Sequence, residues 1–123
     1  IGSGPGLNPQ ETAQFVMSYS DDDGQTWSDP VNLTNELKTS DWYLLAPAPG
    51  SGIMMENGTL VVPVQGRDSG ELEFSTIMTS LDHGDSWRLA PEFARSGTNE
   101  CAVVELGDGS LLLNMRNVRD RGP

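Results

Sequence analysis

The chain has 123 residues, enough for one modest domain with a core of its own. Its net charge of −11 opposes binding to nucleic acid or to an anionic membrane, because both partners require a basic surface. No apolar run approaches the ~18 residues of a membrane-spanning helix. The single cysteine, Cys101, and the single histidine, His83, offer neither an internal disulfide nor a metal-binding cluster, so no metal or other cofactor is expected. We interpret Cys101 as a small buried hydrophobe and His83 as a surface residue.

The chain is expected to be all β. Helix signals are poor, whereas turn signals recur roughly every 8 to 20 residues with short β-rich runs between them, as in a sandwich, barrel or propeller. Residues 34–50 are predicted to form a long connection without regular structure, because Pro47, Pro49 and Gly50 interrupt it. In chain order, strands are predicted at about 12–19, 27–33, 51–56, 59–66, 72–80, 87–93, 100–106 and 111–117.

Two segments, residues 20–27 and 80–87, share the pattern Ser-x-Asp-x-Gly-x-(Ser/Thr)-Trp, with equivalent residues 60 positions apart. Fixed spacing of this kind indicates a repeat architecture. Asp accepts hydrogen bonds from nearby backbone amides and Gly tolerates positive φ, so the pattern predicts a tight turn that the Trp locks by packing. The pattern resembles the Asp-box of the sialidases (neuraminidases), in which the boxes lie at outer turns away from the active site. The resemblance therefore implies structural roles for six residues: Asp22, Gly24, Trp27, Asp82, Gly84 and Trp87.

The predicted strands group into propeller blades. Residues 51–93 supply four consecutive antiparallel strands, which make one complete blade. Asn57 and Gly58 are predicted to form the two-residue hairpin turn between its first two strands. Residues 12–33 are predicted to be the last two strands of the preceding blade, and residues 100–117 the first two of the following blade. Sialidases have six-bladed β-propellers, so the resemblance implies that residues 1–123 form part of such a domain. The chain starts at Ile1 rather than Met, and we interpret it as an internal piece of a longer protein. A small β-sandwich is the alternative fold.

Glu100 and Arg116 are the candidate site residues. If Gly107, Asp108 and Gly109 form a three-residue loop, paired residue numbers sum to 216, and Glu100 lies opposite Arg116 with Cβ atoms ~5 Å apart. A two-residue turn at Asp108 and Gly109 shifts the sum to 217 and puts the two side chains on opposite faces. The sequence leaves both registers open. Judged on the residues alone, a cross-strand salt bridge at the sheet rim, worth ~0–1 kcal/mol, is the simpler explanation of the pair.

The surrounding residues resemble the bacterial type of exo-α-sialidase. That family has an (Asn/Thr)-Glu-(Ala/Cys) step, a strand, a Gly-rich turn, and a strand ending in Asn-(Met/Ala)-Arg-(Asn/Asp). Residues 99–101 and 114–117 match both halves. Residues 46–53 resemble the family's Gly-Pro-Gly-x-Gly-Ile segment, with Ala48 in place of the usual Gly. The resemblance implies that Arg116 belongs to an arginine triad that binds the carboxylate of sialic acid, and that Glu100 activates a tyrosine nucleophile.

The implied activity is the retaining hydrolysis of terminal sialic acid from glycoconjugates. A neutral tyrosine suits this reaction, because the anomeric carbon of sialic acid carries a carboxylate that would repel an anionic nucleophile. The nucleophile, the Asp acid/base and the other two triad arginines are expected outside this chain, since neither Tyr19 nor Tyr43 lies where the family places its nucleophile. Arg119 and Arg121 do not match the triad and are interpreted as part of a solvated loop.

The expected partners are therefore sialylated glycans or glycoproteins, with no role for nucleic acid. The piece alone is expected to be inactive, and the full-length protein to be secreted, periplasmic or at the cell surface. Two alternatives stay open. One is a non-catalytic Asp-box β-propeller that acts as a binding or scaffold module, and the other is a protein that recognises sialic acid without hydrolysing it.

Overall fold

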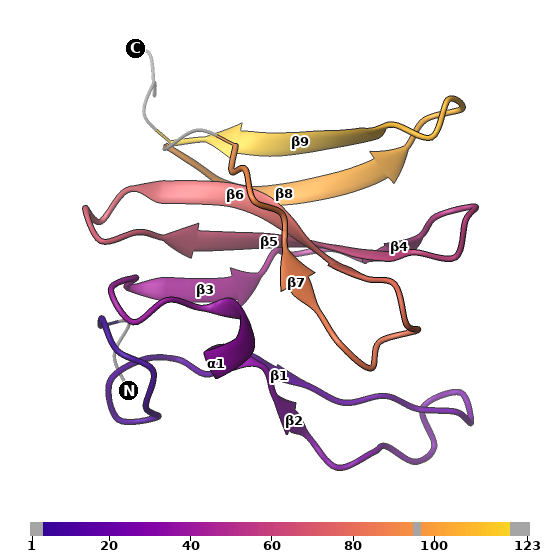
Figure 1. The fold of residues 1–123 in the computed structure, drawn as a ribbon, viewed down its shortest axis with the longest axis horizontal. Helices are drawn as coiled ribbons and strands as arrows, with labels where there is room; N and C mark the ends of the chain where they lie inside the picture. Colours follow the sequence, from indigo (N-terminus) through magenta and orange to yellow (C-terminus); the bar gives the residue numbers. More distant parts are fainter. Residues whose placement is uncertain (1–3, 95–96, 119–123) are drawn as a thin grey trace.

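Three antiparallel β-sheets make up the described part of the chain, residues 4–94 and 97–118 of a computed structural model (Figure 1). Within these ranges α1 supplies the only helical residues, and no helix is long and apolar enough to cross a membrane. The all-β prediction is confirmed, whereas Arg119 and Arg121 lie outside the described residues. The elements are β1 (Val16–Met17), β2 (Val31–Asn32), α1 (Thr34–Leu37), β3 (Leu44–Pro47), β4 (Ile53–Met54), β5 (Leu60–Arg67), β6 (Glu73–Ser80), β7 (Arg88–Leu89), β8 (Thr98–Glu105) and β9 (Leu111–Asn117).

The central sheet is built on β5 and β6. These two strands pair along their whole length, from Leu60 opposite Ser80 to Arg67 opposite Glu73. The strand order is β3–β5–β6–β7, and β4 also pairs with β5. This sheet is the four-stranded blade, and it forms the support against which the rest of the described chain packs.

The first strand of this blade begins earlier than the sequence predicts. The expectation that residues 34–50 lack regular structure is wrong, because this stretch contains α1 and β3. β3 pairs with the second half of β5 and β4 with its first half, so the two short strands form one interrupted edge strand. The interruption includes Pro49, which has no N–H to donate, and Gly50, whose φ is 124°. The Pro and Gly signals locate the break correctly but hide the strand before it.

Smaller two-stranded sheets flank the central one on either side (Figure 1). β1 and β2 pair over only two residues each, which is much less than predicted for residues 12–19 and 27–33. β8 lies against β5 and β6, and Sγ of Cys101 is 3.5 Å from the carbonyl oxygen of Val64. Cys101 is buried, as predicted. The result is one blade with a half blade on each side.

The main core lies between the first half blade and the central sheet. Packing of apolar faces from successive blades is what holds a propeller together, and such burial is the dominant favourable contribution to folding. Side chains of the first hairpin and of α1 meet side chains of β3, β5 and β6 here. The buried cluster consists of Phe15, Leu33, Leu37, Leu45, Val64, Phe74, Met78 and Trp87.

The two hairpins for which the sequence predicts tight turns both have three-residue loops. In the hairpin between β4 and β5, paired residue numbers sum to 114, which centres the loop on Asn57 and shows that the predicted two-residue turn is wrong. In the hairpin between β8 and β9 the sum is 216 from Cys101 to Glu105, so of the two registers that the sequence left open the structure has the one centred on Asp108. Gly58 and Gly109 occupy the third loop position with φ of 89° and 83°, the left-handed geometry that this loop type requires.

Candidate functional site

The two Asp-box turns have the same hydrogen bonds. Asp22 accepts one from the amide of Thr26 at 2.8 Å and one from its hydroxyl at 2.5 Å. Asp82 accepts the same pair from Ser86, at 2.9 Å and 2.5 Å. In each box the first serine donates to the aspartate and accepts from the glycine amide. The predicted repeat is confirmed at the level of the turn, and His83 is exposed within the second box as expected.

Only one of the two box tryptophans is buried. Each indole Nε1 donates to the carbonyl oxygen of its own box glycine, at 3.2 Å for Trp27 and 3.1 Å for Trp87. Trp87 is 8% exposed and belongs to the core, whereas Trp27 is 63% exposed. The prediction that both tryptophans pack against their own blade is therefore wrong for Trp27. Among the described residues β1 pairs only with β2, so no strand equivalent to β5 lies beside it to cover the ring.

Hydrogen bonding lowers the pKa of both box aspartates. The hydroxyl of Thr26 is the main cause for Asp22 and that of Ser86 for Asp82, and the amide of the same residue adds to the effect. Each pKa falls to about 2. All these donors belong to the turn itself, as a structural role requires.

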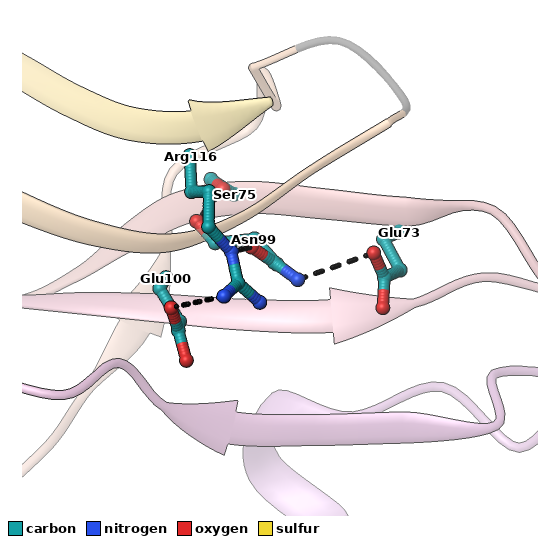
Figure 2. A network of polar contacts seen from close by, with 5 residues as sticks. All are labelled: Glu73, Ser75, Asn99, Glu100 and Arg116. Atoms are coloured by element: carbon teal, nitrogen blue, oxygen red, sulfur yellow. Dashed lines mark hydrogen bonds and ion pairs between the residues drawn. The ribbon is translucent and has the colours of Figure 1, made fainter. Parts of the chain in front are cut away.

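Glu100 on β8 and Arg116 on β9 meet directly. Nη1 of Arg116 lies 2.9 Å from Oε2 of Glu100 (Figure 2). The side chains are 45% exposed for Glu100 and 54% exposed for Arg116, so a ligand can reach both from solvent. The structure thus brings together the two residues that the sequence singles out.

A β-bulge in β8 places two residues opposite Arg116. Between Thr98 and Cys101, three steps along β8 match two steps along β9. Asn99 and Glu100 therefore both face Arg116, although successive residues of a regular strand point to opposite faces. Oδ1 of Asn99 accepts a hydrogen bond from Nε of Arg116 at 2.9 Å. No role for Asn99 could be predicted from the sequence, because an alternating pattern of polar and apolar residues does not reveal a bulge.

Asn99 is in turn held by β6. Its Nδ2 donates to Oε2 of Glu73 at 3.2 Å, and its carbonyl oxygen accepts from the hydroxyl of Ser75 at 2.7 Å (Figure 2). Glu73 and Ser75 were missed by the sequence analysis. They lie on a different sheet, more than twenty residues away in the chain, and no local motif marks them.

An open hollow of about 350 Å³ lies beside the ion pair. This volume is near the lower end of small-ligand pockets, ~300–1,000 Å³. Neither tyrosine of the chain lines it. The lining combines Pro49 with residues of β8 and β9: Glu100, Cys101, Ala102, Asn114, Met115 and Arg116. A guanidinium and a carboxylate are thus both available to a small polar ligand.

Lys38, unlike Glu100 and Arg116, is a charged side chain that is buried. It is 4% exposed, and burial lowers the pKa of its ammonium group. Nζ donates to the carbonyl oxygens of Gly6 at 2.7 Å, Trp42 at 2.5 Å and Thr39 at 3.4 Å. These three acceptors satisfy the ammonium group, so Lys38 ties the N-terminal segment to the chain after α1.

Known proteins resemble this chain in both sequence and structure. A model of the BNR repeat-like domain family matches residues 4–122. A sialidase of Bacteroides fragilis is 45% identical over 117 residues, covering 95% of this chain and 21% of the relative. Among solved structures, a Hadza microbial sialidase shares 44% identity with a TM-score of 0.91, over 95% of this chain and 23% of that one. A Trypanosoma rangeli sialidase in complex with sialic acid shares 31% identity with a TM-score of 0.69, over 83% of this chain and 17% of that one.

The chain spans only about a fifth of the length of these proteins. The matching structures are sialidase β-propellers, which confirms the propeller prediction over the β-sandwich alternative.

Proposed function

The chain belongs to the BNR repeat-like domain family, and we propose on this premise that it forms part of a retaining exo-α-sialidase. The full-length enzyme would hydrolyse terminal sialic acid from glycoproteins and other glycoconjugates. The similarity to named sialidases supports this proposal. The observation that carries it is the 2.9 Å contact between Glu100 and Arg116 beside an open hollow.

In this proposal Arg116 binds the carboxylate of sialic acid. A guanidinium stays charged at any working pH and can bind a carboxylate through two parallel N–H···O contacts. The contacts to Asn99 and Glu100 use two of its five N–H groups, so the group retains donors for a ligand. Two further arginines, from the protein outside these residues, would complete the triad.

Glu100 acts as the base that activates a tyrosine nucleophile. As the tyrosine oxygen attacks the anomeric carbon, Glu100 takes the phenolic proton, and the glycosidic bond breaks. The departing oxygen takes a proton from an acid supplied elsewhere in the protein. Water then attacks the anomeric carbon of the sialyl–tyrosine intermediate and gives a proton to the conjugate base of that acid, while the departing tyrosine oxygen recovers its proton from Glu100. Two displacements at one carbon give retention of configuration.

Hydrolysis of a fluorogenic α-sialoside by the full-length protein tests this proposal. We expect release of the fluorophore, and NMR spectra in which the α anomer of sialic acid forms first. Initial appearance of the β anomer would exclude a retaining mechanism. Binding of sialic acid without release would favour the recognition-only alternative, and absence of both would favour a scaffold.

We also propose that the full-length protein acts outside the cytoplasm, whether secreted, periplasmic or at the cell surface. Its proposed substrates, sialylated glycoproteins, are displayed there. Fractionation of producing cells tests this, with sialidase activity expected in the extracellular or envelope fractions. Activity confined to the cytoplasmic fraction would contradict it.

A further inference from the structure

Asn99 is the buried link between Arg116 and the central sheet. It is 9% exposed, whereas the side chains of Arg116 and Glu100 are half exposed. A guanidinium only donates hydrogen bonds and a carboxylate only accepts them. The amide oxygen of Asn99 must therefore face Arg116, and its nitrogen must face Glu73. The reversed amide would lose both contacts, so this arrangement has one orientation.

The main chain at the bulge is fixed as well. Ser75 is fully buried, and its hydroxyl donates to the carbonyl oxygen of Asn99 at 2.7 Å. Ser75 and Glu73 lie two residues apart on β6, where they pair with Gln65 and Arg67 of β5, respectively. Both the side chain and the backbone of Asn99 are thus hydrogen-bonded to β6, which pairs along its whole length with β5.

We propose that Asn99 is a positioning residue that fixes the guanidinium of Arg116 for carboxylate binding, and that Glu73 and Ser75 hold Asn99 in place. This inference rests on the proposed function, in which Arg116 binds the sialic acid carboxylate. A half-exposed ion pair between two long side chains restrains neither side chain strongly. A buried amide anchored at both ends does restrain its partner, because the contact to Nε sets the direction of the guanidinium plane.

Two ligands that differ only at the carboxylate test this role in the full-length protein. The probes are sialic acid and its methyl ester, titrated by calorimetry. Asn99→Ala should weaken binding of the acid about tenfold, the effect expected for one lost hydrogen bond to a charged group, and leave binding of the ester within about twofold. In an Arg116→Ala background, Asn99→Ala should have no further effect on the acid, because the two residues act through one contact.

Three further variants distinguish a positioning role of Asn99 from a general loss of folded structure. Ser110→Ala removes a single hydrogen bond, to Asp108 in the loop of the same hairpin, and should leave the affinity for both ligands unchanged. Asn99→Asp alone places a new carboxylate next to that of Glu73, and the repulsion between them should weaken binding of sialic acid. The double change of Asn99→Asp with Glu73→Gln exchanges amide and carboxylate, so the contact between them is kept. This double variant should restore binding of the acid to near the wild-type value.

The outcomes separate failure of this inference from failure of the proposed function. Equal weakening of acid and ester by Asn99→Ala, or an undiminished effect in the Arg116→Ala background, would overturn the positioning role and leave the sialidase proposal standing. Wild-type protein that neither hydrolyses a sialoside nor binds either ligand would overturn the proposed function, and this inference with it.

Discussion

Trp27 and Trp87 occupy equivalent positions in the two Asp-boxes and donate the same indole hydrogen bond, yet Trp27 is 63% exposed and Trp87 is 8% exposed. The turn is therefore a self-contained unit that forms with or without a covered tryptophan. What the neighbouring strands add is burial of the ring.

This difference predicts unequal stability effects in the 123-residue chain. Trp87→Ala should lower the free energy of unfolding by ~3–5 kcal/mol, because it opens a cavity in the core. Trp27→Ala should lower it far less, since most of that ring already contacts water. Urea unfolding followed by far-ultraviolet circular dichroism measures both. Equal losses would mean that Trp27 is buried as deeply as its counterpart.

The lowered pKa values of the box aspartates predict the response of stability to acid. A carboxylate with a lower pKa in the folded than in the unfolded state stabilises the fold above its unfolded pKa, ~3.9, and loses this contribution as pH falls through the folded pKa. For Asp82 the folded value is about 2. Wild-type stability should therefore fall between about pH 4 and pH 2. Asp82→Asn should show a smaller fall, because an amide does not titrate.

Thermal unfolding midpoints at pH 5, 3 and 2 measure this difference. Asp21→Asn, a change in the first box outside the shared pattern, is the control and should follow the wild type. An identical fall in the wild type and in Asp82→Asn would contradict the claim that titration of Asp82 contributes to the loss of stability in acid.

Gly66 and Gly107 form a matched pair of substitution sites. A Cβ at Gly66 would lie 2.7 Å from Cε1 of Phe74 and 2.8 Å from the carbonyl oxygen of Leu44, whereas a Cβ at Gly107 would meet nothing within 4 Å. Gly66→Ala should cost ~1–3 kcal/mol through overpacking between β3 and β6. Gly107→Ala should be nearly neutral. Unfolding free energies of the two variants test this, and a neutral Gly66→Ala would show that the sheet relaxes around the added methyl group.

Features encoded by contiguous residues could be predicted from the sequence. The Asp-box hydrogen bonds, for example, join residues no more than four apart. The register of the last hairpin could not be predicted, because the sequence allows two loop lengths, and the structure has the one centred on Asp108. The existence of β3 could not be predicted, because it depends on pairing with β5 about twenty residues later. The bulge was missed for the same reason. It is held by Glu73 and Ser75, which lie on another sheet.

The 123-residue chain alone should release no sialic acid. The proposed mechanism needs a tyrosine nucleophile, an acid and two more arginines that match no position here. We expect no fluorophore release above the rate without enzyme, under conditions in which the full-length protein is active. Measurable turnover by the isolated chain would show that the nucleophile lies within it, and Tyr19→Phe and Tyr43→Phe would then identify which residue it is.

The division of roles between Glu100 and Arg116 is tested most directly by measuring sialic acid affinity and turnover in two variants of the full-length protein. Arg116→Ala should weaken binding ~10- to 100-fold, since it removes hydrogen bonds to a charged group. Glu100→Gln should spare much of the binding but slow turnover by ~10²–10⁴-fold, since only the base function is lost. Turnover near the wild-type value in both variants would contradict the catalytic assignment and leave a non-catalytic propeller as the better explanation.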